Sequence, residues 1–139
     1  MEKTLIFLKP DIYKKKLIGK VINDIEQKFS IIEIKLFKLE RKKIEEFYSV
    51  HKGKDFFTGL IDYISSGPIV AMVIEGENII SNMRKFMGNT DPAKADKGSL
   101  RGKYGQSFDS NVIHGSDSKE SSIKEIPFFF PKYKEILLF

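Results

Sequence analysis

The stretch Ile69-Val70-Ala71-Met72-Val73-Ile74 decides the fold, because its uninterrupted apolar residues predict a buried central strand. The turn signal Ser66-Gly67-Pro68 precedes this stretch, and Gly76 ends it. A second run, Leu5-Ile6-Phe7-Leu8, is just as apolar and ends at Lys9-Pro10, where proline cannot donate to a strand ladder. Both runs therefore predict buried strands.

The segments beside these runs show two different periodicities. Apolar residues recur at helical spacing in residues 17–29, in residues 79–87 and, with a break at Gly53, in residues 41–66. Residues 31–39 alternate between apolar and polar side chains, which predicts a strand. The break at Gly53 indicates that the segment containing it folds as a helical hairpin.

The C-terminal part of the chain is less regular. Residues 88–107 show little periodicity, and a loop of that length inside a compact domain is usually functional. We expect a last strand at residues 108–113. A helix should follow and extend to about residue 126, with Ser116 or Asp117 as its cap.

This order of elements predicts an α+β fold. We expect a ferredoxin-like, four-stranded antiparallel sheet with a βαββαβ core and helices on its faces. No segment repeats, and no linker divides the chain. The sequence therefore predicts a single domain over residues 1–139.

Composition excludes several classes of site. The chain has no cysteine, which excludes disulfides, thiolate catalysis and zinc sites of the cysteine type. It has two histidines, too few for a three-histidine metal site. No apolar run reaches the roughly 18–20 residues that span a bilayer, and no signal-peptide pattern is present. We expect a cytoplasmic protein with no membrane segment.

The run Asn111-Val112-Ile113-His114-Gly115-Ser116-Asp117-Ser118 contains the best candidate for a reactive group. Gly115 would let the backbone turn sharply and a ligand approach, and residues 116–118 would open a helix whose N–H groups favour an anion beside His114. Glu125 could fold back and hold one ring nitrogen. The other nitrogen would then be a defined nucleophile.

Taken alone, these residues leave a second interpretation open. A partly buried histidine before a helix cap would have the same neighbours in the sequence, and most histidines are not catalytic. The wider context of the run favours the reactive interpretation.

That run resembles the active-site signature of the nucleoside diphosphate kinases. The resemblance extends from Thr4 to about Phe130, with similar element order and spacing. Further matching stretches are Leu8-Lys9-Pro10-Asp11, Phe56-Phe57-Thr58-Gly59-Leu60, residues 66–73, Gly88-Asn89-Thr90-Asp91-Pro92-Ala93 and Leu100-Arg101-Gly102.

The resemblance implies an enzyme, a transferase that uses ATP. The γ-phosphoryl group of a nucleoside triphosphate would move to His114 and then to a nucleoside diphosphate, a ping-pong exchange through phosphohistidine with little base specificity. Mg²⁺ would arrive with the nucleotide, held by phosphates and water. Asp117 would contact the ion through water, although it could instead serve only as a helix cap. The chain would form a homo-oligomer, a hexamer in preference to a tetramer.

The resemblance also implies roles for residues that contact the phosphates and the sugar. Lys9 would reach the sugar hydroxyls and the phosphates, and Asn111 would bond the ribose. Arg84 and Thr90 would hold the inner phosphates. Arg101 would hold the phosphoryl group that is transferred.

Two further groups of residues complete the implied site. Tyr48 would lie beside His114 and help to place the transferred group, and Ser116 would bond Glu125, which orients the imidazole. Phe56 and Leu60 would form one side of a slot for the base, opposite Phe108, where the family usually has an aliphatic residue. Each of these residues has an ordinary structural alternative, such as helix capping or core packing. We interpret His51, one helical turn from Tyr48, as structural.

The sequence departs from the family pattern outside the implied site. Ile12 stands where the family usually has glycine, and the turn at Lys28-Phe29 lacks a common glycine. Lys97 replaces a proline in the long loop, which usually makes subunit contacts. Assembly is therefore the property that these changes concern most.

The main alternative is a nucleic-acid-binding module. The net charge of +5 and the pI of about 9.3 would permit it. The basic residues are dispersed lysines, however, and no aromatic RNA-binding strand is evident. Nucleic acid is therefore at most a secondary partner. A catalytically silent scaffold is a third possibility, which the intact set of implied site residues argues against.

Overall fold

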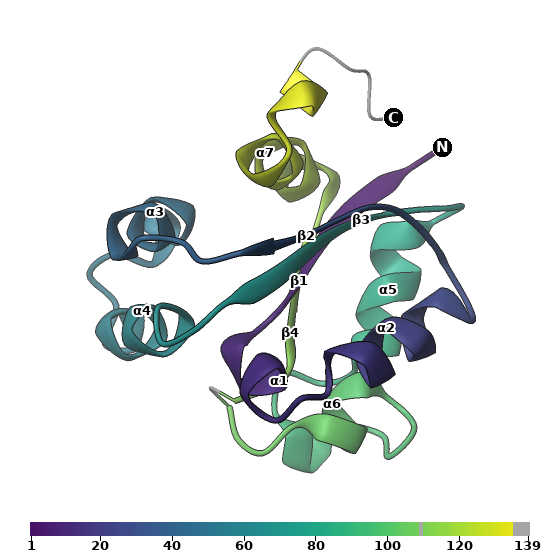
Figure 1. The fold of residues 1–139 in the computed structure, drawn as a ribbon, viewed down its shortest axis with the longest axis horizontal. Helices are drawn as coiled ribbons and strands as arrows, with labels where there is room; N and C mark the ends of the chain where they lie inside the picture. Colours follow the sequence, from purple (N-terminus) through teal and green to yellow (C-terminus); the bar gives the residue numbers. More distant parts are fainter. Residues whose placement is uncertain (109, 135–139) are drawn as a thin grey trace.

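One four-stranded sheet organises the molecule (Figure 1). The computed structural model describes residues 1–108 and 110–134. Its strands are β1 (Lys3–Leu8), β2 (Ser30–Phe37), β3 (Ile69–Glu75) and β4 (Ile113–Gly115). They lie in the order β2-β3-β1-β4, and every neighbouring pair is antiparallel. This arrangement confirms the predicted α+β, ferredoxin-like class.

Helices fill the connections between the strands, and a further helix follows the last strand (Figure 1). They are α1 (Pro10–Lys14), α2 (Ile18–Glu26), α3 (Arg41–Phe47), α4 (Phe57–Ile64), α5 (Ile79–Met87), α6 (Leu100–Tyr104) and α7 (Lys119–Phe129). Short 3₁₀ turns lie at Ser49–His51, Pro92–Lys94 and Pro131–Lys134.

Apolar clusters cover both faces of the sheet, because successive side chains of a strand point to opposite sides. On β1, Ile6 and Leu8 belong to a cluster with α2 and α5. Leu5 and Phe7 belong to a second cluster with α3, α4 and α7. The central strands β1 and β3 are thus buried on both faces, as their continuous apolar sequence predicts.

One edge of the sheet is formed by β2, and it carries exposed apolar side chains. Ile32, Ile34 and Leu36 are exposed large apolar side chains on this strand. A slip in register between residues 31 and 33 marks a bulge in its pairing with β3. An exposed apolar edge of this kind is suited to cover by another chain.

The last strand begins later than the sequence predicts. β4 starts at Ile113 rather than near residue 108, because the backbone just before it turns sharply. Val112 has a φ of 80°, and the N–H of Ile113 donates to the carbonyl of Asn111 at 2.9 Å. His114 therefore lies within the strand rather than after it. Asp109 and residues 135–139 lie outside the described residues.

Three helical features also differ from the sequence prediction. The short helices α1 and α6 were not expected, and α6 falls inside the predicted loop at 88–107. Ser118, and not Ser116 or Asp117, caps α7, because its hydroxyl accepts the N–H of Ser121 at 3.1 Å. The side chains of Ser116 and Asp117 have other hydrogen-bond partners.

Within residues 1–108 and 110–134, no helix combines the length and the apolarity that a membrane span requires.

Candidate active site

His114 is held between aromatic rings in the middle of β4. It pairs with Phe7 across the β1–β4 ladder, and the two rings stack with centroids 4.8 Å apart and planes 17° apart. Phe47 packs its edge against the imidazole at 5.2 Å. These contacts fix the plane of the histidine ring before any ligand binds.

The orientation of that ring is set by Glu125, which α7 places beside it. The Nε2 atom of His114 lies 2.8 Å from Oε1 of Glu125, and the buried hydroxyl of Ser116 donates to the same oxygen at 2.8 Å. An ionised carboxylate can only accept, so Nε2 carries the proton. The lone pair of neutral His114 is therefore on Nδ1.

Tyr48 lies next to the imidazole on the side of the α3–α4 hairpin. Its ring is perpendicular to that of His114, with centroids 6.1 Å apart. Burial, and secondly the charge of Glu125, raise the pKa of Tyr48 well above its usual value. Tyr48 is therefore a neutral phenol that can donate a hydrogen bond at any physiological pH.

His51 packs beside this group. Its ring stacks on Tyr48 at 6.3 Å and contacts Phe56 at 5.2 Å. Burial first, and then the charge of Lys54, lower the pKa of His51. The sequence signal that could have indicated this position is its spacing from the two aromatic residues, because all three lie in one helical hairpin.

Gly115 is required by packing and not by a turn, contrary to the sequence interpretation. Its φ is not among the positive values, and it lies in extended β4. A Cβ at this position would collide with the sulfur of Met87, which comes from α5. The glycine therefore allows α5 to approach β4 closely and so brings Arg84 to the strand.

Two arginines, Arg84 from α5 and Arg101 from α6, donate to backbone carbonyls of this strand. Nη1 of Arg84 donates to the carbonyl of Gly115 at 3.2 Å. The buried guanidinium of Arg101 donates to the carbonyls of Asn111, Gly88 and Ile113, at 3.1, 2.9 and 2.7 Å. Burial, and then the charge of Arg84, lower the pKa of Arg101 to about 10.

Arg101 therefore also stabilises the fold through hydrogen bonds to the backbone, which the sequence did not suggest. Its three bonds tie the loop after α5 to β4 and to the residue before the sharp turn. A guanidinium has five N–H donors, so donors remain for an anion. With a pKa of about 10 it is still a cation at neutral pH.

Lys9 and Asn111 form a buried polar pair at the end of β1. The ammonium of Lys9 donates to Oδ1 of Asn111 at 2.5 Å. The amide of Asn111 donates in turn to the backbone carbonyl of Thr90 at 3.1 Å. The structure thus brings three residues with implied sugar or phosphate contacts into one network.

The implied base slot is open to solvent. Phe56 is 51% exposed and Phe108 is 64% exposed, so neither ring is part of the core. Leu60 lies one helical turn after Phe56 on α4, and the ammonium of Lys54 lies 5.8 Å from the Phe56 ring centroid. Exposed aromatic rings on a rigid scaffold are suited to stacking on a ligand.

The described residues contain no cluster of three or more His, Asp or Glu side chains that could hold a metal ion. The carboxylate of Asp117, in the signature stretch after His114, is exposed and accepts the hydroxyl of Ser121 at 2.6 Å. This bond lowers the pKa of Asp117. One ionised carboxylate fits an ion that is held mainly by phosphates and water.

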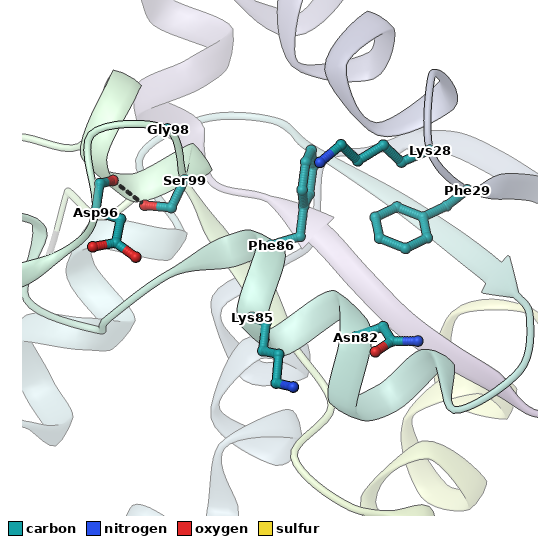
Figure 2. A pocket seen from close by; sticks show the side chains of 8 residues that line it. All are labelled: Lys28, Phe29, Asn82, Lys85, Phe86, Asp96, Gly98 and Ser99. Atoms are coloured by element: carbon teal, nitrogen blue, oxygen red, sulfur yellow. Dashed lines mark hydrogen bonds between the residues drawn. The ribbon is translucent and has the colours of Figure 1, made fainter.

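A pocket of about 470 Å³ lies apart from these residues (Figure 2). Phe86 packs against Phe29 at 5.2 Å, and the ammonium of Lys28 lies over the Phe86 ring at 5.4 Å. These contacts close the turn between α2 and β2 against α5. None of the implied site residues lines this pocket.

The sequence pattern indicates no role for Asp11 or Tyr63. The structure joins them, because the Tyr63 hydroxyl donates to the Asp11 carboxylate and accepts the Asp11 N–H at 3.2 Å. The available signal was the position of Asp11 in the stretch Leu8-Lys9-Pro10-Asp11, which matched the family as a whole.

Comparison with known proteins agrees with this geometry. The family model described as nucleoside diphosphate kinase matches residues 2–135. The nucleoside diphosphate kinase of Methanocaldococcus jannaschii is 48% identical over 130 residues, which is 93% of each chain. That of Persephonella marina is 47% identical and covers 95% of each chain.

Solved structures give the same result for the fold. The apo nucleoside diphosphate kinase of Encephalitozoon cuniculi has a TM-score of 0.91 and 36% identity, covering 99% of this chain and 94% of its own. The Aquifex aeolicus enzyme has a TM-score of 0.88 and 41% identity, with coverages of 93% and 94%. From its sequence, its fold and the residues around His114, this chain belongs to the nucleoside diphosphate kinase family.

Proposed function

We propose that His114 is the group that receives and returns the phosphoryl group in nucleoside diphosphate kinase activity. The activity itself, transfer of a phosphoryl group between nucleotides, follows from membership of the family. The observation that carries the assignment is the 2.8 Å bond between Nε2 of His114 and Glu125. Because this bond occupies Nε2, Nδ1 is the ring nitrogen whose lone pair can act as the nucleophile.

In the first half-reaction, Nδ1 attacks the γ-phosphorus of a nucleoside triphosphate. A P–N bond forms, the bond from phosphorus to the bridging oxygen breaks, and the diphosphate leaves with the electron pair. The imidazole becomes cationic as the P–N bond forms. The carboxylate of Glu125 stabilises that charge, and Ser116 holds the carboxylate in place.

In the second half-reaction, a terminal oxygen of another diphosphate attacks the same phosphorus, and Nδ1 leaves. A phosphoramidate bond stores free energy comparable to that of a phosphoanhydride, so both halves run near equilibrium. A serine ester would instead be a thermodynamic sink. This difference gives a physical reason for a histidine at this position.

The cations beside β4 would balance the charge of the phosphates. We assign Arg84 and Thr90 to the inner phosphates and Arg101 to the phosphoryl group in transfer. Tyr48, as a neutral phenol, would donate to that group without adding charge. Mg²⁺ bound with the phosphates and water, near Asp117, would supply further charge neutralisation.

The sugar and the base would be held by residues farther from His114. We assign the ribose hydroxyls to the pair Lys9 and Asn111. The base would stack between Phe56 with Leu60 on one side and Phe108 on the other. Stacking contributes about 1–3 kcal/mol per base and uses no base edge, so little base specificity is expected.

We also propose that the chain is a homo-oligomer, a hexamer in preference to a tetramer. The exposed apolar side chains on the edge strand β2 support self-association. A cytoplasmic location stays a prediction, which cell fractionation would test.

The test of the assignment is covalent labelling with γ-labelled ATP. The wild type should take up label that is acid-labile and alkali-stable, which is typical of phosphohistidine, and should release it to added nucleoside diphosphate. His114→Ala should take up none. An unlabelled wild type, or equal labelling of His114→Ala, would refute the assignment.

A further inference from the structure

We infer that Tyr63 and Asp11 are positioning residues that fix the base-binding wall of the site relative to its sugar-binding residues. This inference rests on the proposed function, because it concerns how the same nucleotide is held. Neither residue is among those implied to contact the nucleotide.

The first step of the argument is the placement of Tyr63 on its helix. Phe56, Leu60 and Tyr63 are spaced by four and then three residues, so they lie on one face of α4. The face that offers Phe56 to the base therefore also presents the Tyr63 hydroxyl. α3 and α4 lie together at one end of the sheet (Figure 1), and α4 packs against the core there through Ile61 and Ile64.

The second step is what the Tyr63 hydroxyl contacts. It donates to the Asp11 carboxylate and accepts the Asp11 N–H, and the Ser110 side chain lies close enough to influence the pKa of Tyr63. Asp11 follows Lys9 by two residues, and Ser110 directly precedes Asn111. One hydroxyl thus joins α4 to the segment that carries Lys9 and lies close to the segment that carries Asn111.

The third step is the energetic cost of the arrangement. Asp11 is buried, and its Oδ2 atom has no hydrogen-bond partner among the described residues. Burying a carboxylate oxygen without a partner is unfavourable, and native proteins rarely do so without a functional reason. Burial and Asp11 raise the pKa of Tyr63, so the hydroxyl remains a donor at every physiological pH.

The experiment compares Tyr63→Phe with the wild type in steady-state phosphoryl transfer. The variant removes one oxygen and keeps the ring. Because a hydrogen bond to a charged acceptor is lost, the KM for nucleoside diphosphate should rise about tenfold, with kcat within about twofold of the wild type. Inhibition by inorganic triphosphate, which has neither base nor sugar, should not change.

Two further variants separate positioning from general loosening. Asp11→Asn keeps an oxygen that can accept from Tyr63 and should raise KM less than Tyr63→Phe does. Ser66→Ala is the matched control, because Ser66 accepts a hydrogen bond from Lys14 at 2.7 Å and so joins α1 to the end of α4 at an exposed position. It should behave as the wild type.

The outcomes distinguish this inference from the proposed function. A wild type that forms no phosphohistidine would refute the proposed function, and the inference with it. An active wild type whose Tyr63→Phe variant keeps its KM would overturn the inference alone. So would a variant that loses kcat rather than KM, or an equal rise of KM in Ser66→Ala.

Discussion

Glu125 combines two tasks at a single oxygen atom. Its Oε1 accepts from both His114 and Ser116 at 2.8 Å, so the carboxylate orients the ring and is itself held in place. This linkage lets the two contributions be separated by mutation, because one variant removes the charge and the other removes only the support.

We expect Glu125→Gln to slow phosphorylation of His114 more than Ser116→Ala does. Hydrogen bonds to charged groups contribute about 1.5–3 kcal/mol, so loss of the charge should slow the reaction about 10- to 100-fold. Ser116→Ala should cost about fivefold, since Glu125 keeps its bond to the ring. Single-turnover labelling with γ-labelled ATP measures both rates. Equal rates in Glu125→Gln and the wild type would contradict this role.

A second prediction at this scale concerns Ser122, whose buried hydroxyl has no hydrogen-bond partner among the described residues. Ser122→Ala should leave activity unchanged and stabilise the protein by up to about 1 kcal/mol, because an unpaired buried hydroxyl is unfavourable. Urea unfolding of the two proteins measures the difference. A loss of more than about 1 kcal/mol would indicate a partner for the hydroxyl.

At the scale of elements, the long periodic segments were predictable and the short ones were not. The apolar runs at β1 and β3 and the amphipathic helices α2 and α5 follow from periodicity in the sequence. Helices α1 and α6 have five residues each, too few to show a helical period. The start of β4 depends on the left-handed backbone of Val112, a conformation that a β-branched residue rarely adopts.

In the site, likewise, some contacts were predictable from the sequence and others were not. The link from His114 to Glu125 was expected from the signature and the spacing of the two residues. The three carbonyl contacts of Arg101 and the contact between Tyr63 and Asp11 join residues that are far apart in the sequence or use backbone atoms. No pattern of side chains indicates such contacts.

The junction of α6 with the preceding loop gives a prediction at the element scale. A Cβ at Gly102 would overlap the carbonyl oxygen of Asp96, whereas a Cβ at Gly98 would meet nothing within 4 Å. Gly102→Ala should therefore cost about 1–3 kcal/mol of stability and shift the adjacent Arg101, which weakens nucleotide binding. Gly98→Ala is the matched control and should stay within about 0.5 kcal/mol. Thermal unfolding with and without ADP tests both.

At the scale of the whole molecule, the two edges of the sheet carry different kinds of residue. The β4 edge carries His114. The β2 edge carries three exposed apolar side chains and is separated from the site by the two central strands. Self-association through β2 would therefore leave the nucleotide site open.

We expect Ile34→Lys to shift the protein toward smaller species. A charge on this apolar edge is a common device against edge-to-edge association. Ile123→Lys is the matched control, since Ile123 on α7 is 51% exposed and Ile34 is 49% exposed. Light scattering after size-exclusion chromatography gives the mass of each variant. Unchanged mass in Ile34→Lys would place the subunit contact elsewhere.

The stacking of Phe7 on His114 also gives the molecule a built-in spectroscopic reporter. The ring current of a phenyl group shifts protons above its face upfield, and the imidazole lies 4.8 Å away with nearly parallel planes. Because the chain has two histidines, the aromatic C–H signals of His114 should stand apart from those of His51 in an NMR spectrum. Each turnover could then be followed in the unaltered protein, as those signals move when the phosphoryl group arrives and return when it leaves.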